Sequence, residues 1–115
     1  MAALSTGCQR AADIGGAKVD ASRLVAADAE PGAWMSHGRT YSEQRFSPLD
    51  AINAINVAGL GLAWFADLDS NRGQEAMPIA ADSVIYTSTA WSKVKAYDAK
   101  SGTALWSFDP EVPGE

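Results

Sequence analysis

The chain has few cysteines, histidines and basic residues, and each shortage argues against a class of function. One cysteine and one histidine occur in 115 residues, so no internal disulfide can form and a metal site of imidazole and thiolate ligands is not supported. Nine basic residues against fourteen acidic ones give a net charge of -5. Because these bases form no cluster that could follow a phosphate backbone, we expect no nucleic-acid partner.

Long apolar runs are also missing. No stretch approaches the roughly 20 residues that a membrane-spanning helix needs, so we expect no membrane span in this sequence. Residues 1–8 have the small residues that precede a signal cleavage site, without the basic start or apolar region of a complete signal. Two interpretations of residues 1–19 remain open. They are a signal remnant in which Cys8 carries a lipid anchor, or a disordered tail in which Cys8 is incidental.

Two tryptophans, Trp64 and Trp106, lie 42 residues apart, and each closes a short apolar run. This spacing is typical of one propeller blade, which is about 40 residues of four-stranded sheet. Turn residues between alternating segments predict strands at 60–65, 76–79, 84–88, 93–97 and 103–108. Lys93 and Lys95 alternate with apolar neighbours, which predicts one solvent-exposed face for their strand. We therefore expect an all-β chain whose last four strands form an antiparallel meander.

Residues 20–59 lack the alternating pattern of the predicted strands that follow. Asp20 or Ser22 is a candidate N-cap for a short helix that a Pro-Gly pair would end. From 34 to 48, aromatic residues and arginines interleave without a regular period, which is typical of an irregular strap over a larger surface. Asn56 is a candidate cap for one further helical turn. The expected organisation is a tail at 1–19, the helix and strap at 20–59, and a strand plus one blade at 60–115.

The common catalytic and metal-binding motifs do not fit this sequence. The acidic segment from Asp67 resembles the start of a calcium loop, but its sixth position holds Arg72 in place of glycine and its twelfth holds Pro78 in place of glutamate. His37 has no second imidazole or thiolate nearby, so we interpret it as structural. No glycine-rich phosphate loop and no nucleophilic triad are evident. We therefore assign no catalytic and no metal-binding residue to this chain.

Glu75 is the candidate binding residue. It directly precedes the first strand of the meander, so we expect its carboxylate at the end of an inner strand, facing the axis around which propeller blades are arranged. Ligands of propellers bind in the central funnel at that axis. A solvated loop carboxylate is the alternative, and position alone leaves both open.

Residues 96–106 (AYDAKSGTALW) resemble the eleven-residue tryptophan docking motif of quinoprotein propellers, with Ser101 in place of the usual threonine. Further segments resemble, in order and spacing, the N-terminal part of the pyrroloquinoline quinone (PQQ)-dependent alcohol dehydrogenases of the methanol and ethanol dehydrogenase family. These segments are 34–48, 56–64, 74–78, 84–89 and 106–115. The resemblance covers about residues 20–115 and identifies the chain as an N-terminal fragment of such a quinoprotein.

The resemblance implies an eight-bladed periplasmic propeller that binds PQQ and calcium on its axis. It implies oxidation of primary alcohols to aldehydes with a cytochrome or quinone as electron acceptor, and haem c in an additional domain of some members. It also implies that Glu75 binds the quinone and that Trp106 is a docking tryptophan. The family's base, calcium ligands and paired cysteines match nothing in this chain. We therefore expect a truncated propeller, made of the strap, a ring-closing strand ending at Trp64 and the first blade, that is inactive alone and does not bind the cofactor tightly.

The alternative function is a non-enzymatic envelope scaffold lipoprotein, because such propellers also use tryptophan-ended repeats and begin at a lipidated cysteine. Glu75 favours the dehydrogenase, since a scaffold needs no carboxylate that contacts a quinone. A free-standing small β-domain is disfavoured because one four-stranded sheet leaves two apolar faces and two edges uncovered. Residues 1–115 alone should therefore fold poorly or associate.

Overall fold

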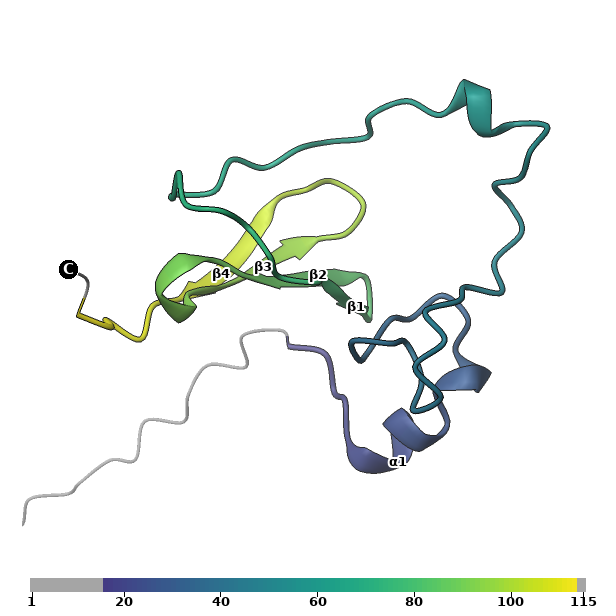
Figure 1. Ribbon diagram of the computed structural model, residues 1–115, viewed down its shortest axis with the longest axis horizontal. Helices are drawn as coiled ribbons and strands as arrows, with labels where there is room; N and C mark the ends of the chain where they lie inside the picture. The colour runs from purple at the N-terminus through teal and green to yellow at the C-terminus, as the bar shows by residue number, and fades with distance from the viewer. Residues whose placement is uncertain (1–15, 114–115) are drawn as a thin grey trace, which may run out of the picture.

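A four-stranded antiparallel sheet is the central element of the computed structural model, which describes residues 16–113 (Figure 1). The strands are β1 (Ile79–Ala81), β2 (Val84–Ser88), β3 (Val94–Asp98) and β4 (Ala104–Phe108), and they lie side by side in chain order. This arrangement confirms the predicted meander. The first strand begins at Ile79 and not at residue 76, because Pro78 has no N–H for a ladder hydrogen bond.

Two local features shape the hairpins of this sheet. Asp82 and Ser83, which join β1 to β2, have φ of 52° and 63°, the left-handed conformation that suits a two-residue turn. The pairing of β3 with β4 shifts register between Ala96 and Tyr97, so Leu105 is an extra residue that forms a bulge. Ala96 and Tyr97 are 0% and 7% exposed. Since consecutive strand residues point to opposite faces, both faces of β3 are covered.

The predicted N-terminal helix is present and short. It is α1 (Ala21–Val25), and the Asp20 carboxylate caps it by accepting a hydrogen bond of 2.8 Å from the backbone N–H of Arg23. A single 3-10 turn, η1 (Ala27–Ala29), follows the helix. The small apolar core between this region and the sheet consists of Ala27, Met35 and Ala81, with Ala17, Leu24 and Ala33 packed around them.

Two contacts anchor the N-terminal region to the first hairpin. Arg23 forms ion pairs of 2.6 Å with both Glu30 and Asp82, and so joins α1 to the β1–β2 turn. Trp34 and Ala80 form an isolated antiparallel bridge, with N–H to O distances of 2.7 and 2.9 Å in the two directions. The outer side of β1 is therefore partly paired by the chain segment that follows η1.

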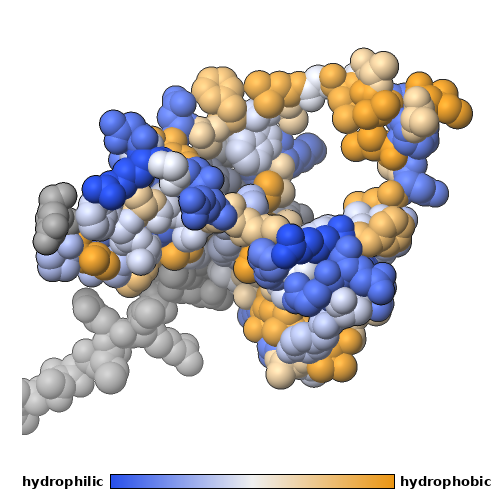
Figure 2. Space-filling model, viewed as in Figure 1, coloured by the Kyte–Doolittle hydropathy of each residue, from blue (hydrophilic) through white to orange (hydrophobic). Residues whose placement is uncertain are grey.

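Residues 46–65 form a wide extended loop with one 3-10 turn, η2 (Val57–Gly59), which leaves the N-terminal region and returns to the sheet (Figure 1). From here on the name strap refers to residues 46–65 alone and not to the predicted strap at 34–48. The predicted helical turn is thus present, but Asn56 does not cap it: its carboxamide bonds the N–H of Asn53 and the carbonyl of Ala51, both at 2.8 Å. Figure 2 shows hydrophobic side chains on the strap surface. The exposed apolar residues of the strap are Phe46, Leu49, Ile52, Ile55, Val57, Leu60, Leu62 and Phe65.

The prediction of a strand at 60–65 is wrong for this structure. These residues pair with no other strand within the described range 16–113. An extended segment becomes a strand only beside a hydrogen-bonding neighbour, and here Trp64 contacts the turn between β3 and β4 instead of a sheet edge. A ring-closing role in a whole propeller stays a prediction.

Residues 1–15 lie outside the described residues, and Cys8 is among them, so both interpretations of the tail stay predictions. Among the helices of residues 16–113, none combines the length and apolar character that a bilayer crossing requires.

Candidate functional site

Glu75 lies at the end of the sheet where β1 begins and β2 ends. Its side chain is exposed and borders a cavity of about 230 Å³ between the segment before β1 and the segment after β2. Because the two strands are antiparallel, these two segments meet at the same end of the sheet. The lining residues are Gly73, Gln74, Glu75, Ala76, Ser88, Thr89 and Ala90. The structure thus places Glu75 beside a strand end, and its role as a cofactor ligand stays a prediction.

Thr89 lines this cavity, and its hydroxyl is buried and unpaired among the described residues. The residue is 8% exposed, and its Oγ1 is buried without a hydrogen-bond partner anywhere in residues 16–113. A buried hydroxyl that lacks a partner costs about 1–3 kcal/mol, so a polar partner that residues 16–113 do not supply would stabilise Thr89. Gln74 joins the two walls, because its Nε2 donates to the backbone carbonyl of Ser88.

Sequence reasoning missed Thr89 as a site residue. Thr89 directly follows β2, which pairs with β1, the strand after Glu75. That position was the signal available in the sequence. The backbone there is strained: within the 3-10 segment η3 (Ala90–Ser92), Trp91 and Ser92 have φ of 63° and 58°. Left-handed conformations of non-glycine residues cost on the order of 1 kcal/mol each and concentrate at functional sites. This turn also lets the Thr89 N–H donate to the Lys93 carbonyl at 2.8 Å.

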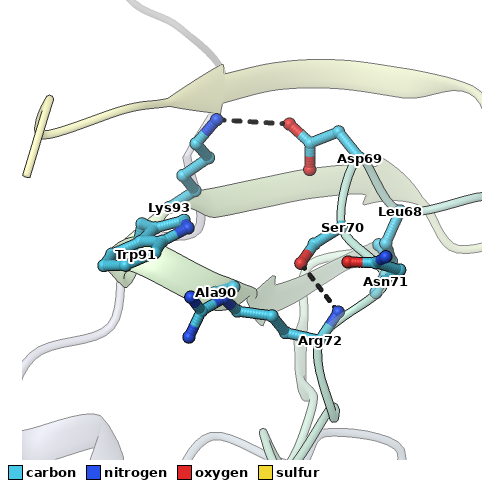
Figure 3. Close-up of a pocket in the computed structure, with 8 residues that line it drawn as sticks. All are labelled: Leu68, Asp69, Ser70, Asn71, Arg72, Ala90, Trp91 and Lys93. Atoms are coloured by element: carbon cyan, nitrogen blue, oxygen red, sulfur yellow. Dashed lines mark hydrogen bonds and ion pairs between the residues drawn. The ribbon is translucent and has the colours of Figure 1, made fainter. Parts of the chain in front are cut away.

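A second and larger cavity, of about 530 Å³, adjoins the first and shares Ala90 with it. Figure 3 shows its walls, in which the Arg72 guanidinium lies over the Trp91 ring with 4.4 Å from Cζ to the ring centroid. Such a cation–π contact is worth about 0.5–1 kcal/mol at an exposed site. It holds the loop that leads to Glu75 against the strained turn after β2.

Lys95 of β3 and Lys93, which directly precedes β3, are partly buried and paired with acids, which corrects the prediction of a solvent-exposed face. Lys95 binds the Asp69 carboxylate at 3.1 Å and is 17% exposed, while Lys93 lies 3.0 Å from Asp109 and 3.5 Å from Asp69. The hydrogen bond from Lys95 lowers the pKa of Asp69 below its ordinary value. The hydrogen bond to Asp109 raises the pKa of Lys93. The segment after the strap therefore supplies the acid that neutralises this face.

Asp69 is thus committed to lysines and is not free to form part of a calcium loop. Across residues 16–113, no group of three or more His, Cys, Asp and Glu side chains is placed to hold a metal ion. His37 is exposed, and its Nε2 lies 2.6 Å from Nη2 of Arg45, on a loop outside both cavities.

The turn of the docking motif is organised by Asp98 and contacted by Trp64. The Asp98 carboxylate accepts hydrogen bonds from the N–H groups of Ser101 (2.7 Å) and Lys100 (3.1 Å), and the Ser101 backbone bond is the main cause of its lowered pKa. Gly102 has φ of +73°, and a Cβ added there would lie 2.5 Å from Cδ2 of Trp64. Only glycine therefore suits this position.

Trp106 lies on β4, and its ring centroid is 5.9 Å from that of Tyr86 on β2. Its Nε1 is buried and, as far as the described chain goes, has no hydrogen-bond partner. By contrast, Nε1 of Trp64 donates to the Ala99 carbonyl at 3.0 Å. One tryptophan of the pair is therefore docked on a turn, and the other keeps an unused donor.

Comparisons with known proteins cover most of the chain, including the sheet and the cavity at Glu75. The PQQ family described as the glucose/ethanol/alcohol dehydrogenase β-propeller domain matches residues 34–115. The dehydrogenase subunit of the quinone alcohol dehydrogenase of Komagataeibacter europaeus is 59% identical over 91 residues, which are 79% of this chain and 12% of that protein. The quinohemoprotein alcohol dehydrogenase ADH IIB of Pseudomonas putida is 58% identical over 96 residues, 84% of this chain and 14% of that protein.

Solved structures agree with these sequence matches. The quinohemoprotein alcohol dehydrogenase ADHIIG of Pseudomonas putida HK5 aligns with a TM-score of 0.78 and 55% identity, over 81% of this chain and 14% of that one. A europium-containing methanol dehydrogenase aligns with a TM-score of 0.72 and 30% identity, over 80% of this chain and 16% of that one. This chain therefore spans about one seventh of the length of these proteins. The expected propeller fold class is confirmed, and the chain belongs to the PQQ-dependent glucose/ethanol/alcohol dehydrogenase β-propeller family.

Proposed function

We propose that this chain is the N-terminal portion of a periplasmic PQQ-dependent dehydrogenase that oxidises primary alcohols to aldehydes. In this proposal β1 to β4 form the first blade, and Glu75 helps to bind the quinone. The observation that supports it most directly is that one cavity at the end of the blade is lined both by the exposed Glu75 and by Thr89, whose buried hydroxyl has no partner among residues 16–113. A blade with only a scaffolding role has no use for that pair.

The donor set at this cavity fits one edge of a polar, planar cofactor. Glu75 would accept a hydrogen bond from a ring N–H of the cofactor, and the Thr89 hydroxyl would donate one to a carbonyl or carboxylate oxygen. Complete ligand pockets have volumes of roughly 300–1,000 Å³, whereas this cavity has about 230 Å³. The chain therefore provides one wall, and we expect it to be inactive and to bind PQQ weakly alone. When bound, the quinone supplies the two-electron acceptor for the alcohol.

We assign the metal ligands and the catalytic base to the remainder of the full-length protein. The calcium ion expected for this family would act there as a Lewis acid. A cytochrome or quinone is the proposed electron acceptor, consistent with a relative named 1-butanol dehydrogenase (cytochrome c) from Thauera butanivorans, which is 49% identical over 84 residues. Haem c in a further domain is proposed by analogy with the quinohemoprotein relatives. A lipid anchor at Cys8 belongs to this proposal as well.

The test uses the full-length protein reconstituted with PQQ and Ca²⁺, and it measures quinone affinity and the oxidation of primary alcohols. Glu75→Gln should weaken PQQ binding by roughly tenfold or more, the effect of losing one hydrogen bond to a charged group. Glu111→Gln makes the same chemical change at an exposed position after β4 and should leave the affinity unchanged. A full-length protein that binds no quinone and oxidises no alcohol would instead support the scaffold lipoprotein.

A further inference from the structure

Arg39 is a buried cation in the loop between η1 and the strap. Its side chain is 7% exposed, and its Nη1 donates to the Asp28 carboxylate at 3.0 Å. Asp28 is itself 85% exposed. The Nε and Nη2 atoms of Arg39 are buried, and the structure gives them no hydrogen-bond partner among the residues it describes. One edge of the guanidinium is therefore paired and the other is not.

The unpaired edge is the one that recognises oxyanions. Nε and Nη2 of a guanidinium point in parallel and bind the two oxygens of a carboxylate or phosphate in a bidentate fork. A buried charged donor without a partner is costly, so the loop is built for an acceptor that the described residues do not provide. Asp28 cannot fill this place, because it already occupies Nη1.

Arg39 and Asp28 border a polar cavity of about 300 Å³. The remaining lining residues are Gly38, Thr40, Ser42, Gln44, Arg45 and Phe46. Arg45 thus also lines the cavity, with its Nη2 2.6 Å from Nε2 of His37, and the hydroxyls of Thr40 and Ser42 are 2.7 Å apart. No residue of this cavity lines the cavity at Glu75, so the two features are separate.

The loop that carries these groups is held in an unusual conformation. Arg39, Glu43 and Arg45 have φ of 72°, 53° and 54°. The Arg45 N–H donates to the Gly38 carbonyl at 3.3 Å, which closes the loop on itself. The backbone is thus folded to bring both arginines to one cavity, although Glu43, the other acid of the loop, forms no ion pair with Arg39 in the described chain.

We propose that this cavity is an oxyanion-binding site in which Arg39 provides a bidentate contact and Arg45 the second positive charge. The ligand class is a carboxylate or phosphate group. Its source is either a carboxylate from the remainder of the full-length protein or a free anion. Nε and Nη2 are buried among the described residues, so a free anion would reach them only if the guanidinium turned toward the cavity.

The experiment titrates the full-length protein with inorganic phosphate and with acetate by calorimetry, and determines its crystal structure. The variants are Arg39→Gln, Arg39→Lys and Lys18→Gln. Arg39→Lys keeps the charge without the bidentate fork, and Lys18→Gln removes an exposed positive charge outside the cavity. A free anion predicts saturable binding that Arg39→Gln weakens by roughly ten- to a hundredfold. Arg39→Lys should weaken it less, and Lys18→Gln should not change it.

An internal carboxylate gives a different result that also supports the site. The wild type then binds neither anion, and the crystal structure shows an Asp, Glu or terminal carboxylate on Nε and Nη2 of Arg39. The proposal is overturned if phosphate binding persists in Arg39→Gln. It is equally overturned if neither anion binds the wild type and the crystal structure shows only backbone carbonyls or water on these nitrogens. This second result comes from the wild type alone, so it does not depend on whether a variant folds.

Discussion

The indole Nε1 of Trp64 lies 3.0 Å from the carbonyl oxygen of Ala99, although 35 residues separate them in the chain. The same ring lies against Gly102, and its centroid is 6.2 Å from that of Tyr97. This contact joins the end of the strap to the β3–β4 turn without any strand pairing. At this point the Trp64 side chain, packed against Gly102, takes the place of sheet hydrogen bonds.

Replacing Gly102 should break this fit. In the full-length protein, Gly102→Ala places a Cβ about where the Trp64 ring lies and forces a left-handed φ on alanine, so we expect a loss of about 1–3 kcal/mol in the free energy of unfolding. Gly59→Ala is the matched control, because a Cβ at Gly59 meets nothing within 4 Å. Chemical denaturation measures both variants. Equal stability of the two would show that the docking contact contributes nothing.

Thr89→Val should have opposite effects on stability and on cofactor affinity. Without cofactor the change removes a buried hydroxyl that lacks a partner among residues 16–113, so the apoprotein should be stabilised by about 1 kcal/mol. With PQQ present, the lost donor should weaken quinone binding. Thermal unfolding of the apoprotein and quinone titration of the same sample separate the two effects. Thr87→Val, in β2, is the control and should change neither by much.

Asp98 makes a defined contribution to the dependence of stability on pH. Its pKa is lowered chiefly by the backbone N–H of Ser101, so the folded state binds a proton less readily than the unfolded state. This contribution is fully present above the ordinary Asp pKa of about 4 and is lost as the pH falls through the lowered value of the folded protein. Urea unfolding from pH 7 to pH 2 measures it. Asp98→Asn should flatten this part of the curve, and an unchanged slope would contradict the assignment.

Removing the carboxylate of Asp69 should expose the electrostatic role of the segment after the strap. Asp69→Asn leaves Lys95, 17% exposed, without its 3.1 Å partner, so we expect a lower Tm and a weaker dependence of Tm on salt concentration. Asp67→Asn changes an exposed neighbouring acid and should have little effect. Calorimetry at low and high ionic strength gives both quantities. A Tm that does not respond to Asp69→Asn would mean that Lys93 and Lys95 find other partners.

Residues 1–115 produced alone should associate or fail to fold cooperatively. The strap exposes eight large apolar side chains in succession, among them Ile55 at 94%, and exposed apolar surface of this extent promotes association. Size-exclusion chromatography, dye binding and calorimetry test this. A monodisperse monomer with one cooperative transition would contradict the view that the strap needs a larger surface to cover it.

Local chemistry made much of the fold predictable. Strand β2 lies at the predicted residues 84–88, Asp20 caps the helix, and polar residues, Asp82 and Ser83, form the turn before β2. These features depend on neighbours in the sequence. The strand predicted at 60–65 is absent from the described chain because a strand requires a hydrogen-bonding partner. The hydrophobic pattern of a segment shows only that the segment could pair, not that a partner is present.

The candidate site was predictable only in part for the same reason. Glu75 was found because it stands directly before the predicted strand at 76–79, which is a local signal, although β1 itself begins at Ile79. Thr89 gains its interest from burial without a partner, and Arg39 from one unpaired edge. Burial without a hydrogen-bond partner depends on residues distant in sequence, so it cannot be predicted from composition or from the spacing of motifs.

The bridge between Trp34 and Ala80 has a consequence for self-association. It occupies part of the outer side of β1, so within residues 16–113 the sheet keeps one fully open edge, that of β4. A sheet with a single open edge can pair with an identical edge once, in a two-fold arrangement that leaves no free edge for a third copy. Misassembly through strand pairing should therefore favour symmetric dimers through β4 over fibres.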